Sequence, residues 1–351
     1  MLVVALLVTL ALPIEEWRTG DQRLMLEAAP AEGAPAWPRR IWIDTDAACG
    51  HGGRTDPDDC FAIALLARAA QFQIAGISTV FGNAPHAVVE RTTRELAAKL
   101  SQETGRSISV HSGSAVPIAQ RTPGRTPAQN ALRAALEQGP LTIVALGPLT
   151  NLAGVLEEDP SLAGRVARLI AVMGRRPGHI FHPSEGASGG ILLGHGPVFR
   201  DLNFVLDADA AAQLIALHLP MSLVPYDAAR GIELTGADLD RLAGAGGALA
   251  WVAQRADAWL DYWRSDIGRA GFYPFDLLAA AYVLQPSWLR CSRVHARVAR
   301  DNTLFIPFWR PTALLVGTRD APASAPALYC SNTREDLKPL LMQLLTQRSA
   351  N

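Results

Sequence analysis

Residues 41–66 read IWIDTDAACGHGGRTDPDDCFAIALL, in which an apolar run leads into one acidic pair and a glycine-rich segment leads into a second. The run Ile41–Ile43 is typical of the end of a buried strand. Asp44 and Asp46 follow it directly, so both are expected at the carboxyl edge of that strand. Open α/β sheets place their binding and catalytic sites at this edge.

The second acidic pair opens the helix that follows. Asp56 is a suitable N-cap, and Asp58 and Asp59 would then face the positive end of the helix dipole. Taken alone, Asp-Pro-Asp-Asp is explained by helix capping. Beside the pair that ends the strand, however, four carboxylates would converge and repel one another unless a cation held them. Oxygen ligands without Cys or His partners favour Ca²⁺ or Mg²⁺ over zinc.

The composition is that of an enzyme rather than a nucleic-acid-binding protein. The chain has 351 residues, of which 49% are hydrophobic, and a formal net charge of −1. This balance indicates neither a basic surface for nucleic acid nor an acidic tail. Strand and helix patterns alternate from Arg40 to about Gln285 without a linker, so we expect one α/β domain over residues 39–351.

Residues 1–38 differ from the rest of the chain. Leu2–Leu12 is an uninterrupted, mostly aliphatic stretch, shorter than the roughly 20 residues that span a bilayer. It is similar to a signal-peptide core, with Thr9 and Ala11 as small residues for cleavage, but no positive residue precedes it. Secretion, membrane tethering and a cytoplasmic location therefore all stay open. Glu27–Pro38 is rich in Ala and Pro and is expected to be a linker.

The four cysteines show neither CxxC spacing nor the density of a disulfide scaffold. We expect buried thiols without a chemical role. In an exported chain, Cys49 and Cys60 could instead close the segment between the two acidic pairs. The other two cysteines are Cys291 and Cys330.

Three further strand patterns end near polar groups, at residues 74–80, 141–146 and 169–173. Asn83 lies in the turn after the first of them. The Gly147-Pro148 turn leaves the Leu146 carbonyl at the edge without a continuing ladder. Asp276 precedes the apolar helix Leu277–Leu284, where it could serve either as a cap or as a ligand.

In order and spacing these pieces resemble the calcium-dependent nucleoside hydrolases, the inosine-uridine-preferring type and its relatives. The resemblance covers about Arg40 to Gln285, and each piece is weak alone but specific in combination. The pieces are Asp44-Thr45-Asp46 with Asp58-Asp59, Thr79-Val80-Phe81-Gly82-Asn83, Gly147-Pro148-Leu149-Thr150-Asn151, Val172-Met173-Gly174, Asp201-Leu202-Asn203 with Asp207, and Asp276 in Phe-Asp-Leu-Leu-Ala.

The resemblance implies an open, mainly parallel sheet flanked by helices, assembled as a homo-oligomer, either dimer or tetramer. It also implies that Asp46 is the general base. The implied Ca²⁺ ligands are Asp46, Asp59, Asp276 and the backbone carbonyl of Leu146. The implied substrate-binding residues are Asp58, Asn83, Met173, Asp201, Asn203 and Phe275.

The implied reaction is hydrolysis of the N-glycosidic bond of a ribonucleoside to free base and ribose, in nucleoside salvage. Such cleavage passes through an oxocarbenium-like sugar, which carboxylates and oriented hydroxyl contacts stabilise. A Ca²⁺-bound water would lose its proton to Asp46. The partner is then a small nucleoside, with no nucleic acid involved.

Several residues depart from the family pattern. Phe275 stands where the inosine-uridine type has a His that serves the departing base. An aromatic residue there tilts the expectation toward purines, although a core Phe explains it equally. The insertion Ala47–Pro57, with His51 and Arg54, could reshape the pocket or supply a group to it. Asp201 is one methylene shorter than the family's Glu on the ribose 5′ side.

Histidines and aromatic residues offer further candidates. His51, His182 and His195 lie in Gly- or Pro-rich segments and titrate near neutrality, although each is more often a surface residue. His195 is the first to test as the acid for the leaving base. It lies in the stretch Gly186–Gly196, which is either a connection or a lid.

A set of aromatic residues recurs at helix-compatible spacing. Core packing or a subunit contact explains this as well as a base-stacking pocket does. Tyr262 and Trp263 lie nearest to Asp276 in sequence and are the better pocket candidates. The full set is Trp251, Trp259, Tyr262 and Trp263.

Two other functions fit parts of the pattern. A haloacid-dehalogenase-type phosphatase also carries Asp-x-Asp after a strand and uses Mg²⁺, but it needs a phosphate-contacting Lys. Only Lys99 and Lys338 are present, one in a helical pattern and one near the C terminus. A nucleoside-binding protein that keeps the calcium site but has lost hydrolysis is the second alternative. It would be stabilised by ligand without releasing free base.

The C-terminal part carries no recognisable chemistry. We expect an edge strand at Ala313–Gly317, a loop at Pro322–Pro326 and a closing helix at Glu335–Leu345.

Overall fold

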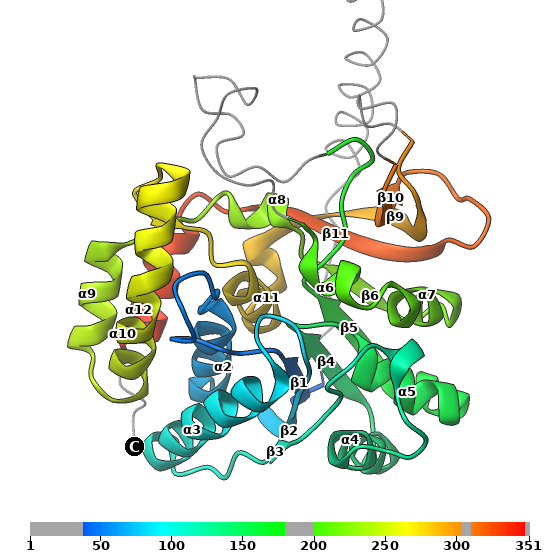
Figure 1. Cartoon of the computed structure of the whole chain (residues 1–351), viewed down its shortest axis with the longest axis horizontal. Coiled ribbons are helices and arrows are strands. Elements are labelled where there is room, and N and C mark those ends of the chain that lie inside the picture. The colour runs from blue at the N-terminus through cyan, green and yellow to red at the C-terminus, as the bar shows by residue number, and fades with distance from the viewer. Residues whose placement is uncertain (1–37, 180–199, 303–309, 348–351) are drawn as a thin grey trace, which may run out of the picture.

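The computed structural model describes residues 38–179, 200–302 and 310–347. Within these ranges nine strands form one sheet, in the order β10-β9-β11-β6-β5-β4-β1-β2-β3 (Figure 1). β9 runs antiparallel to both of its neighbours, and the remaining pairs are parallel. The prediction of an open, mainly parallel sheet is confirmed. The strands are β1 (Arg40–Thr45), β2 (Gln73–Thr79), β3 (Val110–His111), β4 (Leu141–Ala145), β5 (Val166–Ala171), β6 (Met221–Leu223), β9 (Leu289–Arg300), β10 (Thr312–Gly317) and β11 (Ala325–Thr333).

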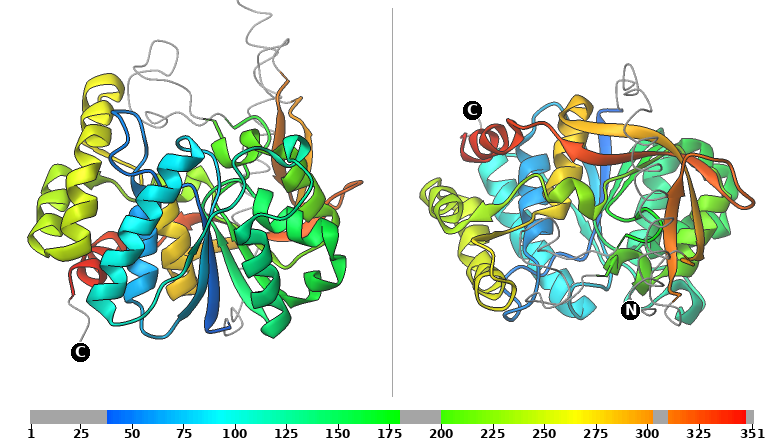
Figure 2. Two further views of the ribbon diagram at one scale, coloured as in Figure 1. Left: turned by 60° about the horizontal axis from the view of Figure 1, so that its bottom comes forward. Right: turned by 90° about the horizontal axis from the view of Figure 1, so that it is seen from above.

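Helices cover both faces of the sheet (Figure 2). Apolar side chains of one face form a core with α2 (Asp58–Arg68), α3 (His86–Thr104), α8 (Tyr226–Ala229), α9 (Gly236–Gly244), α10 (Gly247–Tyr262), α11 (Phe275–Leu284) and α12 (Leu337–Thr346). The opposite face packs on α4 (Pro127–Gln138), α5 (Thr150–Glu158) and α7 (Ala208–Ala216). The remaining elements are α6 (Leu202–Leu206), the short pair β7 (Leu234–Thr235) and β8 (Gly271–Phe272), and the helical turns Ile118–Gln120, Pro160–Arg165, Trp263–Ile267 and Pro286–Trp288.

Strand β1 shows how the sequence assigns side chains to the two faces. Ile41 and Ile43 belong to the core on the α2 side, whereas Trp42 belongs to the core on the α4 side. Successive residues of a strand alternate in this way. Thr45 therefore shares the α2 face, and Asp44 shares the face of Trp42.

The chain order locates the site. From β1 the chain adds β2 and β3 on one side, and β4 then pairs with the opposite side of β1. Strand order reverses between β1 and β4, and in open α/β sheets ligands bind outside the carboxyl ends of the strands at such a point.

Both pairs of cysteines form disulfides, Cys49–Cys60 and Cys291–Cys330, and none of the described cysteines is free. The expectation of idle thiols is therefore wrong, and the alternative pairing of Cys49 with Cys60 holds. The second bond joins residues that lie opposite one another on β9 and β11. Spacing along the chain could not reveal it, because the two strands are brought together only by the sheet.

The C-terminal strands are only partly predictable. β10 is the expected edge strand and α12 the expected closing helix. The loop expected at Pro322–Pro326 ends earlier than predicted, because β11 begins at Ala325. β9 gives no clear apolar signal, since four arginines occupy its 12 residues.

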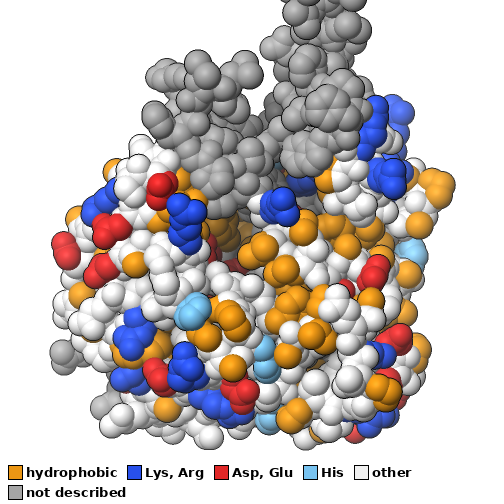
Figure 3. Space-filling model, in the orientation of Figure 1, with side chains coloured by type: hydrophobic (Ala, Val, Ile, Leu, Met, Phe, Trp, Pro, Cys, Tyr) orange, Lys and Arg blue, Asp and Glu red, His pale blue; other side chains and the backbone are white. Residues whose placement is uncertain are grey.

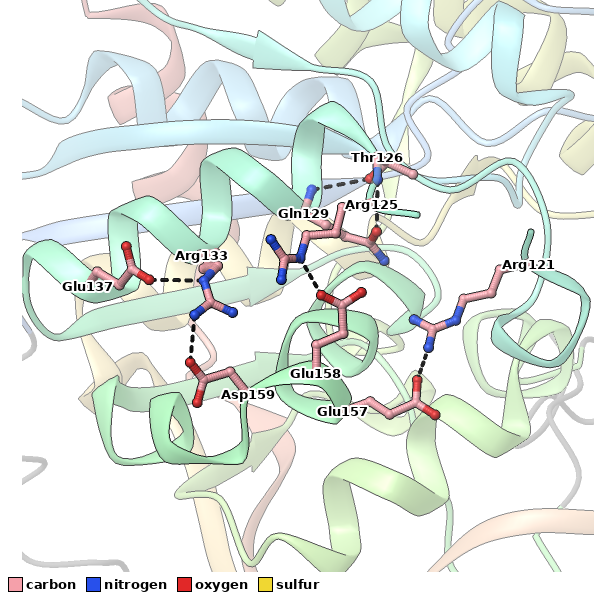
Figure 4. Close-up of polar contacts among 9 residues, drawn as sticks. All are labelled: Arg121, Arg125, Thr126, Gln129, Arg133, Glu137, Glu157, Glu158 and Asp159. Carbon is pink, nitrogen blue, oxygen red and sulfur yellow. Dashed lines mark hydrogen bonds and ion pairs between the residues drawn. The ribbon is translucent and has the colours of Figure 1, made fainter. Parts of the chain in front are cut away.

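Ion pairs connect α4 and the segment before it with the C-terminal end of α5 (Figure 4). Arg133 contacts Asp159 at 2.8 Å, and Arg121 and Arg125 pair with Glu157 and Glu158. Partly exposed pairs such as these each contribute little stability. Among the described helices, none is both long and apolar enough to cross a membrane.

We predict that replacing both Cys291 and Cys330 with Ser lowers the free energy of unfolding by about 4 kcal/mol, because the bond closes a loop across a separation of 39 residues. Urea unfolding of the variant and of the oxidised wild type measures this difference. Wild type under strong reductant is the control. An unchanged midpoint in the variant would contradict the prediction.

Candidate functional site

A cavity of about 410 Å³ opens at the carboxyl edge of the sheet. In Figure 3 this side of the molecule is hollowed near its centre, with acidic and hydrophobic side chains in the hollow and basic ones at its rim. The acidic and amide lining residues are Asp46, Asp56, Asp58, Asp59, Asp201, Asp276, Asn83 and Asn203. The others are Arg54, Leu146, Val172, Met173, Gly174, Arg200, Leu202, Tyr226, Trp259, Tyr262 and Phe275.

Three acidic side chains lie close together in the cavity lining. Asp58, Asp59 and Asp276 are buried, and each has a carboxylate oxygen within 4.8 Å of the others. The Asp276 backbone N–H donates to Asp58 Oδ2 at 2.7 Å, which links the first turn of α11 to that of α2. The Thr45 hydroxyl donates to Asp59 Oδ1. Helix starts and a strand end thus fix the three carboxylates.

Asp46 lies beside this triplet rather than within it. The backbone N–H of Asn83 donates to Asp46 Oδ2 at 2.8 Å. A Cβ on Gly82 would lie 1.9 Å from the same oxygen, so the turn after β2 can approach Asp46 only with glycine at this position.

Burial and crowding raise the pKa of each of these groups. The pKa of Asp59 rises to about 7, through burial first and then the charge of Asp58. Burial, followed by the charge of Asp59, raises the pKa of Asp46 well above its usual range. The pKa of Asp276 is likewise raised well above its usual range, by burial and then by Asp58. No ion pair between described residues involves any of the four carboxylates.

The site fits a hard divalent cation. Its converging donors are carboxylate oxygens, Leu146 also lines the cavity, and neither thiolate nor imidazole is among the described lining residues. The Leu146 carbonyl accepts from Asn203 Nδ2 at 2.6 Å. A carbonyl has two lone pairs, so this bond leaves one for a metal ion.

Asp44 does not join the cluster, and the expectation that it converges with Asp46, Asp58 and Asp59 is wrong. Its Oδ1 accepts from Ser78 Oγ at 2.7 Å and from Asn151 Nδ2 at 2.8 Å. The alternation along β1 turns it to the opposite face. Asp276 takes its place among the converging acids.

The other residues expected at the substrate line this same cavity. The Asn83 amide is engaged by the inserted loop: its Nδ2 donates to the Asp56 carbonyl at 2.7 Å, and its Oδ1 accepts from the Asp56 N–H. Asp201 accepts from the Gly174 N–H at 2.7 Å, and burial raises its pKa to about 6. Met173 lines the cavity beside them. His182, His195 and the stretch Gly186–Gly196 lie outside the described residues.

Aromatic side chains also line the cavity. The Tyr226 and Phe275 rings stack at 5.5 Å, and the Trp259 and Tyr262 rings lie 5.2 Å apart. Trp263 is fully buried and does not line the cavity, so only Tyr262 of the two expected residues does. Trp259 lines it although it lies further from Asp276 in sequence. Tyr226 has no sequence signal that points to the cavity.

The insertion contributes to the cavity directly. Arg54 and Asp56 line it, whereas His51 is exposed and does not. Neither Lys99 nor Lys338 is among the lining residues: Lys99 lies over Trp251 and Lys338 pairs with Asp238. The cavity therefore lacks the lysine that a haloacid-dehalogenase-type phosphatase requires.

Comparison with known proteins agrees with this geometry. The family model "Inosine-uridine preferring nucleoside hydrolase" matches residues 41–306. The chain belongs to this family and is an N-ribohydrolase, an enzyme that hydrolyses the N-glycosidic bond of nucleosides. This membership, together with relatives named as ribonucleoside hydrolases, supports N-glycosidic hydrolysis over a phosphatase reaction.

Individual relatives are distant in sequence. The non-specific ribonucleoside hydrolase RihC of Salmonella newport is 28% identical over 259 residues, which cover 66% of this chain and 77% of that protein. The structure of the plant nucleoside hydrolase PpNRh1 matches with a TM-score of 0.68 at 20% identity, covering 90% of this chain and 99% of that one. The purine-preferring ribonucleoside hydrolase of Gardnerella vaginalis matches with a TM-score of 0.65 at 17% identity, covering 88% and 98%.

We predict that Gly82→Ala lowers kcat by roughly 10²-fold, because the added methyl displaces the Asp46 carboxylate and misplacement by about 1 Å can cost that much. Steady-state kinetics of base release measures the effect. Gly164→Ala is the matched control, since a Cβ there meets no atom within 4 Å. Full activity of Gly82→Ala would show that Asp46 does not need its observed position.

A second prediction concerns pH. The pKa of Asp59 is about 7 in the metal-free folded chain, against about 4 when unfolded. Its contribution to stability is full below pH 4 and is lost as pH rises through 7. Chelated protein should therefore lose stability between these values, while Ca²⁺ should stabilise it increasingly, because the ion binds the ionised carboxylates.

Thermal unfolding in chelator and in Ca²⁺, from pH 5 to 8, tests this. The two melting curves should separate as pH rises. A constant or shrinking gap would be inconsistent with a cation at these acids.

Proposed function

We propose that the enzyme cleaves ribonucleosides by activating a Ca²⁺-bound water with Asp46 as general base, with a modest preference for purines. One observation carries the proposal: buried carboxylates without a cationic partner among the described residues line the same cavity as a group of aromatic side chains. The carboxylates suit a cation with a sugar diol, and the aromatic side chains suit a planar base.

Asp46, Asp59, Asp276 and the Leu146 carbonyl would hold the ion. Bound Ca²⁺ supplies a water of lowered pKa and a fixed contact for the ribose diol. The ion's charge also favours the ionised carboxylates that burial disfavours. The residues that hold the ion are thereby kept in the form that the reaction needs.

Asp46 removes the proton from the attacking water. The Asn83 N–H orients its carboxylate, and a positioned base of this kind typically contributes about 10²- to 10⁴-fold. Positive charge that develops on the sugar is stabilised by the surrounding carboxylates. No covalent intermediate is needed, because water attacks the anomeric carbon directly.

Asp58 and Asn203 are placed to orient the ribose. The Asp58 carboxylate accepts hydrogen bonds from the N–H groups of Asp59 and Asp276, at 3.1 and 2.7 Å. Its orientation is therefore fixed before substrate binds. Asn203 donates to the carbonyls of Leu146 and Val172, which ties its position to the proposed metal ligand. Preorganisation of this kind reduces the entropy lost on reaching the transition state.

The base preference rests on Phe275 and Tyr226. Their stacked rings offer apolar area that a bicyclic base covers more fully than a monocyclic one. The Gardnerella enzyme is named for a purine preference, whereas RihC is named as non-specific. We therefore propose broad acceptance with purines favoured.

We also propose export of the enzyme. The two disulfides favour an oxidising compartment, and the hydrophobic segment within residues 1–38 would direct the chain there. Residues 39–351 would then be the working domain. Assembly into a dimer or tetramer stays a prediction.

Release of free base from a panel of purine and pyrimidine ribonucleosides, with Ca²⁺ and after chelation, tests the proposal. Activity should disappear on chelation and return with Ca²⁺, and purine substrates should give the higher kcat/KM. Release that is unaffected by thorough chelation would refute the metal mechanism.

We predict that Asp46→Asn lowers kcat by about 10²- to 10⁴-fold and that Asp276→Ala abolishes turnover. The amide cannot accept the water proton, and removal of Asp276 leaves the ion without a ligand. Asp209→Asn, on the exposed surface of α7, is the control. Near-normal activity in either site variant would contradict the assignment.

A further inference from the structure

The inserted loop is fixed to the rest of the site at several points. The Cys49–Cys60 disulfide ties its beginning to α2, directly after the acidic pair. The Asn83 amide holds the Asp56 backbone through both N–H and carbonyl. A chain anchored at both ends keeps the residues between them close to the cavity.

Arg54 is the residue that this loop presents to the cavity. Its guanidinium carbon lies 5.0 Å from the centroid of the Tyr262 ring, within the range of a cation–π contact. Asp266 lies 3.9 Å from the same side chain, which stays 75% exposed. The contact with Tyr262 places Arg54 beside one of the aromatic residues that line the cavity.

Among the described lining residues, only Arg54 and Arg200 carry a positive charge. None of the described lining residues is a histidine, and Phe275 occupies the position next to Asp276. The other lining cation, Arg200, adjoins Asp201 in sequence, on the side that the resemblance assigns to the ribose 5′ group. Arg54 is therefore the better placed of these two cations to contact a departing base beside Tyr262.

We propose that Arg54 is a catalytic residue that stabilises the departing base by donating hydrogen bonds to it, an inference that rests on the proposed function. The water oxygen bonds to C1′ and its proton passes to Asp46. The electron pair of the C1′–N bond goes to the base, where charge reaches ring nitrogens and carbonyl oxygens. Arg54 donates to these atoms and stays protonated, so the proton that neutralises the base comes from Asp46 through solvent.

The chemistry of the guanidinium suits this role. It carries five N–H donors in a planar fork. A donor aimed at developing negative charge is typically worth about 10²- to 10³-fold in kcat. Contact with the Tyr262 ring restricts the Arg54 guanidinium, so the side chain loses less conformational entropy when it contacts the base.

Two substrates that differ in their leaving group test the proposal. Inosine needs its departing base stabilised, whereas p-nitrophenyl β-ribofuranoside releases an anion that is stable without help. Arg54→Ala should lower kcat for inosine by roughly 10²-fold and leave kcat for the nitrophenyl riboside within about threefold. Arg54→Lys, which keeps the charge, should recover part of the loss.

Controls separate this role from a structural one. His51→Ala changes an exposed residue of the same loop and should leave both substrates unaffected.

An equal loss on both substrates would overturn the proposal, since the arginine would then support the site rather than the base. Unchanged kinetics for inosine would overturn it as well. A wild-type enzyme that cleaves neither substrate with Ca²⁺ present would instead refute the proposed function, and the role of Arg54 with it.

Discussion

The mutual repulsion of buried carboxylates is the constraint around which this molecule is arranged. Asp46, Asp58, Asp59 and Asp276 are almost fully withdrawn from water, and among the described residues none of them has a basic partner. Buried charge is costly unless it is compensated, and the carboxylates of Asp46, Asp58 and Asp59 are oriented by backbone N–H groups and a hydroxyl. The surrounding fold thus brings together acids whose ionised form a cation would stabilise.

Backbone geometry, more than side-chain choice, secures this arrangement. The switch in strand order brings the ends of β1 and β4 together, and the first turns of α2 and α11 face the same point. Gly82 permits the closest approach, because any side chain there would meet Asp46. The acids therefore sit where a strand edge and two positive helix ends coincide.

Much of this is legible in the sequence, for physical reasons that differ from residue to residue. Apolar runs identify β1, β2, β4 and β5, and the polar groups after them point to the cavity edge. The motif alone wrongly predicts that Asp44 joins the acidic cluster. A motif does not specify which face of the sheet a side chain occupies, whereas alternation along the strand does. Trp259 and Tyr226 are hard to assign, since packing between distant helices has no signature in a single stretch. The Cys291–Cys330 pair escapes prediction for the same reason, whereas Cys49–Cys60 is one of the alternatives that the sequence offers.

The inserted loop contains cavity-lining residues that the family motif does not identify. Arg54 and Asp56 stand outside the compact family motif, so only the folded loop reveals that both reach the cavity. The disulfide lies one residue beyond Asp59, and it links the shape of the loop to the helix that carries the acids.

The hydrogen bond between Asp276 and Asp58 spans 218 residues of chain. Contacts of such separation form late in folding, because the entropy lost in closing a long loop must be spent before the contact contributes any stabilising energy. During synthesis the first acids emerge long before the last one, and the nascent chain carries an incomplete cluster until α11 docks. The site is therefore complete only in molecules in which α11 has packed against α2. A partly folded chain lacks the full set of acids.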